Sequence, residues 1–502
     1  MTLSTWPRAA LSLLCGAALV LGFAPVGWYP LLPLLLALWL WSLRAASPRQ
    51  AAWQGFCLGW GLYLAGVSWV YVSIHTFGGA PAWLAVLLVL FLSAYLASFL
   101  AVSMGLAWWL APAGAVRLLL ALPACWLLGE HLRGWVFDGF PWLSLGYALS
   151  PAPGASGLVA LGGVLLLGWV LWSLAAALGL LLERRWWPAA LAVVPLGLGA
   201  ALAPPPSQWT QVLGEPLRVA LVQGNIEQQN KWKPDNLLPT LEMYDGLTRS
   251  LPEADLVIWP EVAIPASLYR VQPWFDAWQV EAAERGQTVL AGVITRVDQH
   301  PYNTVYALGP QPGRYVKQHL VPFGEYFPVP DWVRPIFDWL DLPFSDIRTD
   351  LPSDRFLRVG TTQIAMSICF EDLFPADFAR QADGSQLLVN VTNDAWFAGS
   401  LAPWQHLQIA RVRAAETGRP LLRVANTGIS AHIDADGGLQ GQIDWGQRAV
   451  LEVDVQPRSG HTPYMHWQDR PLSGLAALLL LLLLCRHVVR ISHSRASAPE
   501  LS

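Results

Sequence analysis

Residues 211–465 contain one cysteine, Cys369, whose position could make it a nucleophile. It follows the apolar, strand-like run Thr362–Ile368, and the acidic residues Glu371 and Asp372 come directly after it. Because acidic side chains favour the first turn of a helix, Cys369 is predicted at a strand-to-helix corner. There, backbone N–H groups and the positive helix end favour a thiolate and an oxyanion. The alternative is a small buried hydrophobic residue, the commoner fate of an unpaired cysteine.

Two sets of side chains could activate such a thiol. In the first, His319 or His406 takes the thiol proton. In the second, a carboxylate takes the proton, and an ammonium stabilises the thiolate and the charge of a tetrahedral intermediate. Glu261, directly after the apolar run Leu256–Pro260, and Lys317, in another strand-like piece, are the candidates for the second set. Each of these two residues alone is more often a solvated surface group, so only their combination is informative.

Short apolar runs alternate with polar, helix-like stretches around these residues. The predicted strands are Arg218–Asn225, Asp255–Pro260, Thr288–Thr295, Asn303–Leu308, Thr362–Cys369, Leu387–Thr392, Leu421–Asn426 and Ala431–Ile433. The predicted helices are Leu237–Ser250, Trp274–Arg285 and Gln405–Thr417. Asp436-Gly437-Gly438 is a hairpin signal. This alternation indicates a layered α/β domain.

The charged residues are distributed very unevenly along the chain of 502 residues. Of 66 charged residues, ten lie within residues 1–210 and 56 in the remainder. A soluble surface normally has about a quarter of its residues charged, so the first 210 residues must lie in a membrane. The net charge of −4 excludes a nucleic-acid binder built on a basic surface. The chain is therefore predicted to be an integral membrane protein with one sizeable soluble domain.

Eight apolar segments are predicted to span the membrane, since a spanning helix needs roughly 17–25 apolar residues. They are Ala9–Val26, Trp28–Leu43, Trp53–His75, Trp83–Leu110, Ala115–Leu132, Ser156–Leu182, Trp187–Ala203 and Leu472–Cys485. The first is interpreted as an anchor and not as a cleaved signal, because further spans follow it. Glu130 and Arg133, three residues apart near the end of the fifth, are expected to form an ion pair at headgroup level.

Basic residues predict the orientation of these spans. They gather in alternate short loops and at both ends: Arg8, Arg44, Arg49, Arg117, Arg184, Arg185, Arg486, Arg490 and Arg495. The other short loops contain only Arg133. Positive loops face the cytoplasm, so both termini are expected there. Residues 1–210 then form a membrane domain with seven helices, residues 211–465 an extracytoplasmic catalytic domain, and residues 466–502 the eighth helix and a cytoplasmic tail.

Three motifs occur in the order typical of one enzyme superfamily. They are Ile258-Trp259-Pro260-Glu261, the run from Tyr315 to Glu325 (YVKQHLVPFGE), and Ser367-Ile368-Cys369-Phe370-Glu371. They resemble those of the nitrilase, or carbon–nitrogen hydrolase, superfamily. The resemblance implies an αββα sandwich with a Glu, Lys and Cys triad.

Further segments resemble the apolipoprotein N-acyltransferases, a membrane-embedded branch of that superfamily in the bacterial inner membrane. They are Phe23-Ala24-Pro25, the run from Ser68 to His75 (SWVYVSIH), Gly139-Phe140-Pro141-Trp142, Val222-Gln223-Gly224-Asn225-Ile226 and Asn393-Asp394-Ala395-Trp396-Phe397. The resemblance implies eight helices with the catalytic domain inserted before the last. It also implies transfer of an acyl chain from the sn-1 position of a phospholipid to the α-amino group of an S-diacylglyceryl-cysteine on an apolipoprotein.

The resemblance also assigns roles to individual residues. Cys369 would be the nucleophile, Glu261 the general base and Lys317 the cation on the oxyanion side. Glu325 would orient Lys317 or the acyl carbonyl, and Glu371 would be a further acid of the active site. The supporting positions are Trp232, near lipid entry, Asn393, which shapes the pocket or a turn, and Phe370, where some members have Tyr.

The residues leave two rival hypotheses. One is a lipid- or lipoprotein-binding protein with a decayed nitrilase domain, against which the intact set of Glu261, Lys317 and Cys369 counts. The other is a membrane-tethered amidase that hydrolyses a soluble amide with the same triad. A single span would suffice for a tether, which favours the acyltransferase. The sequence contains no metal-binding spacing such as Cys-x-x-Cys and no phosphate-binding loop, so no metal or cofactor is expected. The expected partners are a phospholipid donor, a diacylated apolipoprotein and the bilayer, with no nucleic acid, and the chain is expected to be a monomer.

Overall fold

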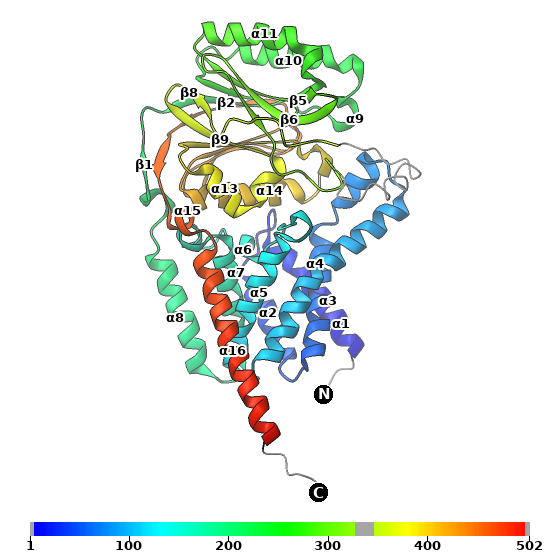
Figure 1. Ribbon diagram of the computed structural model, residues 1–502, viewed down its shortest axis with the longest axis vertical. Coiled ribbons are helices and arrows are strands. Elements are labelled where there is room, and N and C mark those ends of the chain that lie inside the picture. The colour runs from blue at the N-terminus through cyan, green and yellow to red at the C-terminus, as the bar shows by residue number, and fades with distance from the viewer. Residues whose placement is uncertain (1–4, 327–345, 497–502) are drawn as a thin grey trace. The chain divides into compact units, whose positions relative to one another are not determined.

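The computed structural model describes residues 5–326 and 346–496, drawn as a ribbon in Figure 1. The chain forms two compact units. The first consists of Met1–Ser68, Leu87–Ala203 and Trp467–Ser502, and the second of Trp69–Val86 and Pro204–His466. The first unit is helical, whereas the second is an α/β domain joined by a short segment from the N-terminal half of the chain.

Apolar helices make up the first unit. Its main helices are α1 (Thr5–Leu19), α2 (Leu31–Ser42), α3 (Pro48–Gly66), α4 (Ala82–Leu110), α5 (Leu122–Arg133), α7 (Ala155–Leu182), α8 (Trp186–Leu202) and α16 (Arg470–Ala496). Within the described residues, three helical stretches are long and apolar enough to cross a membrane: Ala82–Leu110, Ala155–Leu182 and Arg470–Arg490. Three apolar helices are shorter: Trp6–Gly22, Leu31–Ser42 and Trp186–Leu202. Each of the eight predicted segments overlaps a helix, but eight crossings remain a prediction.

Two of the predicted segments are interrupted. Helix α3 ends at Gly66, where the hydroxyl of Ser68 donates to the carbonyl of Ala65, and a π-helical turn, η2 (Val72–Phe77), follows. The fifth segment begins as a second π-helical turn, η3 (Arg117–Ala121), before α5. Pro123 in the first turn of α5 lacks an N–H and cannot continue the α-helical bonding pattern, and a wider turn accommodates it.

Glycines allow helices α1 and α3 of the first unit to pack closely. A Cβ atom on Gly16 of α1 would lie 1.9 Å from a backbone oxygen of α3, and one on Gly61 of α3 would lie 1.9 Å from a backbone oxygen of α1. Only glycine permits such an approach.

The predicted pair of Glu130 and Arg133 forms at 2.6 Å, with the side chain of Arg133 fully buried. Arg133 also donates to two carbonyls of the loop that follows α5 and so fixes that loop.

Two β-sheets face each other in the second unit. The first sheet has the order β14-β2-β3-β5-β6-β7, with β4 beside β5, and the second has the order β13-β12-β11-β10-β9-β8. The strands of the first sheet are β2 (Leu217–Gln223), β3 (Leu256–Ile258), β4 (Ile264–Ser267), β5 (Thr288–Val297), β6 (His300–Leu308), β7 (Gly313–Val316) and β14 (Ala449–Val455). Those of the second are β8 (Leu357–Val359), β9 (Thr362–Ile368), β10 (Leu387–Thr392), β11 (Leu421–Ala425), β12 (Ser430–Ile433) and β13 (Leu439–Ile443). A separate ribbon pairs β1 (Thr210–Val212) with β15 (Arg458–Gly460).

Alternating side chains separate the layers of this domain. On β9, Ile364, Met366 and Ile368 enter the core between the sheets, whereas Ala365 faces the outer helices. Helices α10 (Leu237–Arg249) and α11 (Leu268–Glu284) cover the first sheet, and α13 (Pro375–Ala382) and α14 (Ala402–Thr417) cover the second. The layers are visible in Figure 1 and confirm the predicted αββα sandwich.

A segment from the N-terminal half of the chain packs into the second unit. The hydroxyl of Ser73 in η2 donates to the carbonyl of Trp396 at 2.9 Å. The rings of Trp69 and Phe397 lie 4.6 Å apart between centroids, and those of Phe77 and Trp396 lie 5.8 Å apart. Residues Asp394–Phe397 form a short 3₁₀ turn, η8, which therefore has this segment as a direct neighbour.

Candidate active site

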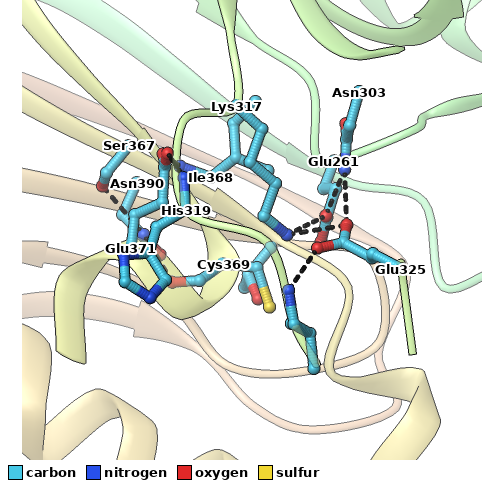
Figure 2. Close-up of polar contacts among 12 residues, drawn as sticks. Glu261, Asn303, Lys317, His319, Glu325, Ser367, Ile368, Cys369, Glu371 and Asn390 are labelled. Carbon is cyan, nitrogen blue, oxygen red and sulfur yellow. Dashed lines mark hydrogen bonds and ion pairs between the residues drawn. The ribbon is translucent and has the colours of Figure 1, made fainter. Parts of the chain in front are cut away.

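The predicted catalytic residues all come from the ends of strands that border the central core. Glu261 lies three residues after β3, Lys317 directly after β7, and Cys369 directly after β9. Strands β3 and β7 belong to one sheet and β9 to the other. The two sheets thus bring the three side chains to one site, as Figure 2 shows.

Lys317 lies between two carboxylates. Its ammonium donates to Oε1 of Glu325 at 2.8 Å and to Oε1 of Glu261 at 3.3 Å, and its side chain is 1% exposed. The amide of Asn303 donates to the same two oxygens, at 2.7 Å for Glu261 and 3.3 Å for Glu325. Burial alone would lower the pKa of Lys317, but the charges of Glu325, Glu261 and Cys369 outweigh it and hold the pKa well above its ordinary value. The lysine is therefore a permanent cation.

Cys369 occupies a left-handed backbone position at the start of the 3₁₀ turn η7 (Cys369–Leu373), with φ of +52°. Its side chain keeps some solvent exposure, but it packs against the core between the sheets, and its surroundings desolvate the thiol. Burial and the charge of Glu261 raise the pKa of this thiol above its ordinary value, and Lys317 offsets only part of the increase. The thiol is therefore protonated at rest and needs a base before it can attack a carbonyl carbon.

Glu371 fastens the turn of Cys369 to the loop of Lys317. One of its oxygens accepts from the N–H groups of Gln318 and His319, at 2.6 and 3.0 Å. The other accepts from the N–H of Ile368 at 2.6 Å and from the hydroxyl of Tyr315 at 2.9 Å. Burial raises the pKa of this carboxyl, although the backbone donors counteract the effect. The four donors engage both oxygens, which suits a positioning group better than the predicted active-site acid.

The two histidines considered as alternative bases have other contacts. The ring of His319 stacks on Phe374, with centroids 3.6 Å apart. His406 directs both ring nitrogens at the carboxylates of Asp372 and Asp394, and Nε2 also lies 3.3 Å from the carbonyl oxygen of Cys369. These contacts favour the set of Glu261, Lys317 and Cys369 over a Cys–His pair.

Comparisons with known proteins agree with this constellation. The carbon–nitrogen hydrolase family model matches residues 218–464, and the model of the apolipoprotein N-acyltransferase N-terminal domain matches residues 15–178. An apolipoprotein N-acyltransferase from Pseudomonas putida is 41% identical over 490 residues, which cover 95% of this chain and 96% of the relative. The chain belongs to the apolipoprotein N-acyltransferase family. The relatives from Azotobacter vinelandii and Methylococcus capsulatus, with the same name, are 42% and 41% identical and cover 95% and 93% of this chain and 94% of each relative.

The supporting residues predicted from the resemblance to the apolipoprotein N-acyltransferases differ in exposure. Trp232 is 52% exposed and follows the short helix α9 (Gln228–Lys231). Phe370 is buried and lies edge-on to Phe374, with ring centroids 5.4 Å apart. The amide nitrogen of Asn393 donates to Gln228, and its amide oxygen accepts from Asn426. Asn393 therefore fastens the segment that carries Trp232.

Sequence reasoning missed two groups beside the base. Asn303, on β6, joins the carboxylates of Glu261 and Glu325; asparagine is uncommon within strands, and this is the signal that could have revealed it. Lys231 is 1% exposed, and its ammonium lies 3.5 Å from the carbonyl oxygen of Glu261. The composition around Lys231 gives no sign of its burial, because lysine is normally a surface residue.

Proposed function

We propose that this member of the apolipoprotein N-acyltransferase family transfers an acyl chain from the sn-1 position of a phospholipid to an apolipoprotein. The acceptor is the α-amino group of its N-terminal S-diacylglyceryl-cysteine, and the acyl group passes through a thioester on Cys369. The observation that carries this proposal is the buried ammonium of Lys317 between Glu261 and Glu325 at the strand end that faces Cys369.

In the first half-reaction, the Glu261 carboxylate takes the proton of the Cys369 thiol. The negative charge moves from Glu261 to Cys369, and both act on Lys317, so the buried ammonium still has an anion beside it. The thiolate attacks the ester carbonyl carbon, and Lys317 and the N–H of Phe370 stabilise the tetrahedral oxyanion. The intermediate collapses, the C–O bond of the ester breaks, and the leaving alkoxide receives the proton from Glu261. Lysophospholipid departs and the thioester remains.

In the second half-reaction, the acceptor amine attacks the thioester carbonyl carbon. Glu261, again a carboxylate, takes a proton from the attacking amine. The C–S bond breaks, the proton returns to the thiolate of Cys369, and the amide product leaves. A partly occluded, apolar site favours the amine over water.

The remaining supporting residues position the catalytic groups, contact the lipid or supply packing. Glu325 holds Lys317 at 2.8 Å, and Glu371 holds the loop that follows Lys317 against the turn of Cys369. The exposed ring of Trp232 contacts the entering lipid. Phe370 supplies packing, and any acceptor contact made by a tyrosine hydroxyl in other members is missing from this chain.

The reaction requires a site at the outer leaflet, because both substrates are anchored in the bilayer. The charge asymmetry of the short loops supports eight crossings with both termini in the cytoplasm. The catalytic domain, residues 211–465, then lies on the periplasmic side of the inner membrane. In the sequence it follows the seven helices of residues 1–210 and precedes the eighth, in residues 466–502. The protein acts as a monomer.

Mass spectrometry of the intact protein tests the proposal. Detergent-purified protein is incubated with phospholipid in the absence of acceptor, and we expect a mass gain of one acyl group on Cys369. The adduct should disappear when a diacylglyceryl-cysteine peptide is added, with formation of the acylated peptide. Cys485→Ala, at an exposed cysteine of α16, is the control and should keep the adduct, whereas Cys369→Ala should lose it. Absence of the adduct in folded wild-type protein, or its release by water alone, would favour an amidase instead.

A further inference from the structure

Four buried ionisable side chains surround the backbone of the turn that carries Cys369. They come from four different elements: Asp372 from η7, Asp394 from η8, His406 from α14 and Arg423 from β11. All four are between 0 and 1% exposed. The mechanism above uses none of them, so their burial requires another explanation, since buried charges are costly unless they are paired.

Arg423 links the two acids of this buried cluster. It donates to Asp394 at 2.8 Å and lies 3.6 Å from Asp372. It also donates to the amide oxygen of Asn390 at 2.8 Å. With Arg423 as the one permanent cation of the four, two ionised aspartates would leave the buried cluster with a net charge of −1.

The geometry of His406 supplies the missing positive charge. Its Nε2 lies 2.9 Å from Oδ1 of Asp372, and its Nδ1 lies 3.1 Å from Oδ1 of Asp394. An ionised carboxylate can only accept hydrogen bonds, and a neutral imidazole has only one N–H. Both contacts are satisfied together when both ring nitrogens carry a proton. Burial and Arg423 lower the pKa of His406, but Asp372 and Asp394 outweigh them and raise it.

The buried cluster acts on the carbonyl of Cys369. The amide nitrogen of Asn390 donates to this oxygen at 3.3 Å, and Nε2 of His406 also lies 3.3 Å from it. In a planar trans peptide group the C=O and the N–H point in opposite directions, and this peptide group is trans. Fixing the carbonyl of Cys369 therefore also fixes the direction of the Phe370 N–H. The left-handed φ of Cys369 is a conformation that persists only where surrounding contacts enforce it.

We infer that His406 is a positioning residue: held as an imidazolium between Asp372 and Asp394, it fixes the peptide plane between Cys369 and Phe370 and so aims the Phe370 N–H at the oxyanion. This inference rests on the proposed function, which assigns the oxyanion to that N–H. The charged groups that face the imidazole are Asp372, Asp394 and Arg423.

A charge-matched pair of variants separates this role from a general electrostatic effect. Glutamine extends its amide nitrogen about as far as Nε2 of histidine, whereas asparagine reaches only as far as Nδ1. His406→Gln and His406→Asn therefore remove the same charge, but only His406→Gln keeps a donor near the Cys369 carbonyl. His432→Gln is the matched control, because His432 is another buried histidine, lies on β12 and has Asp434 as its charged neighbour.

Single-turnover formation of the acyl-enzyme is then compared with alkylation of Cys369 by iodoacetamide, a displacement that forms no oxyanion. We expect His406→Asn to acylate about 10- to 100-fold more slowly than His406→Gln, with the KM for phospholipid unchanged. Alkylation rates should agree within about threefold between the two variants, because their charge is the same. Equal acylation rates, or parallel loss of both reactions in His406→Asn alone, would overturn the positioning role.

Nitrogen-15 NMR of histidine-labelled wild-type protein tests the charge state even if the variants do not fold. The signals of His406, assigned by elimination with variants that each replace one of the other histidines, should lie in the imidazolium range at pH 7. A neutral imidazole at pH 7 would overturn the inference. Wild-type protein that forms no acyl-enzyme would instead refute the proposed function, and the NMR result would remain valid.

Discussion

Replacing Lys231 by methionine should stabilise the protein by about 3 kcal/mol at pH 7. Burial lowers the pKa of Lys231 from the ordinary 10.5 to about 8, and the nearby Glu261 offsets only part of this effect. Each pKa unit corresponds to about 1.4 kcal/mol, so the folded state pays about 3 kcal/mol to keep this ammonium charged. Methionine has a similar length, carries no charge, and gives up only a long hydrogen bond of 3.5 Å.

The sign of the pH dependence follows from the lowered pKa. Below pH 8 both the folded and the unfolded protein carry the charge, so the full penalty applies. Between pH 8 and 10.5 the folded protein releases its proton first, and the advantage of methionine falls to about 1.4 kcal/mol at pH 9.5. Thermal unfolding of the full chain in detergent should show a Tm gain of about 3–5 °C at pH 7, and a clearly smaller gain at pH 9.5.

Lys317→Met is the matched comparison, because it removes the other buried lysine. It leaves the carboxylates of Glu261 and Glu325 without their ammonium partner, and we expect it to destabilise the protein by about 3–5 kcal/mol. The sequence contains only three lysines, so carbon-13 NMR of labelled lysine can follow Lys231 directly, with the exposed Lys233 as a reference. No gain in stability at pH 7, or an undiminished gain at pH 9.5, would refute the assignment of Lys231 as a buried cation that Glu261 compensates only in part.

Three further predictions concern the proposed catalytic groups. Glu325→Gln should slow single-turnover acylation about 10- to 100-fold, because Lys317 loses its 2.8 Å ionic partner; an unchanged rate would reduce Glu325 to a scaffold residue. Glu371→Gln should lower the free energy of unfolding by about 1–3 kcal/mol, since an amide NH₂ would face N–H donors that now meet a carboxylate. A thermal shift assay measures the change, and an unaltered Tm would contradict the prediction. The raised pKa of Cys369 predicts that iodoacetamide alkylates it more slowly at pH 8 than a free cysteine, with a rate still rising above pH 9; a plateau near neutral pH would contradict this.

The elements with a strong periodic pattern could be predicted from the sequence. Each of the eight predicted strands overlaps a strand of the sandwich, and the Asp436-Gly437-Gly438 signal lies in the antiparallel connection between β12 and β13. The missed strands had weaker signals. Strand β14 is only partly buried, and its polar residues Glu452 and Asp454 interrupt the apolar run. Strand β4 is four residues long and contains a proline, which counts against a strand.

The residues of the site divide in the same way. Glu261, Lys317 and Cys369 could be proposed because each lies at or near the end of a strand-like run, and the ends of such runs can be compared in the sequence without coordinates. Asn303 and the cluster of Asp372, Asp394, His406 and Arg423 could not be found in this way. Their roles depend on contacts between elements up to about 50 residues apart in the chain, and no local pattern encodes which buried charges will meet.

The contact between η2 and η8 means that the catalytic domain cannot be cut from this chain at its sequence boundaries. Trp396 and Phe397 pack against Trp69, Ser73 and Phe77, which are synthesised more than 300 residues earlier. A fragment that begins at Pro204 would leave this aromatic surface uncovered next to Asp394. The domain is therefore a composite product of two distant parts of the polypeptide, and soluble versions for crystallography or screening would need a graft of residues 69–86 or a polar redesign of the η8 turn.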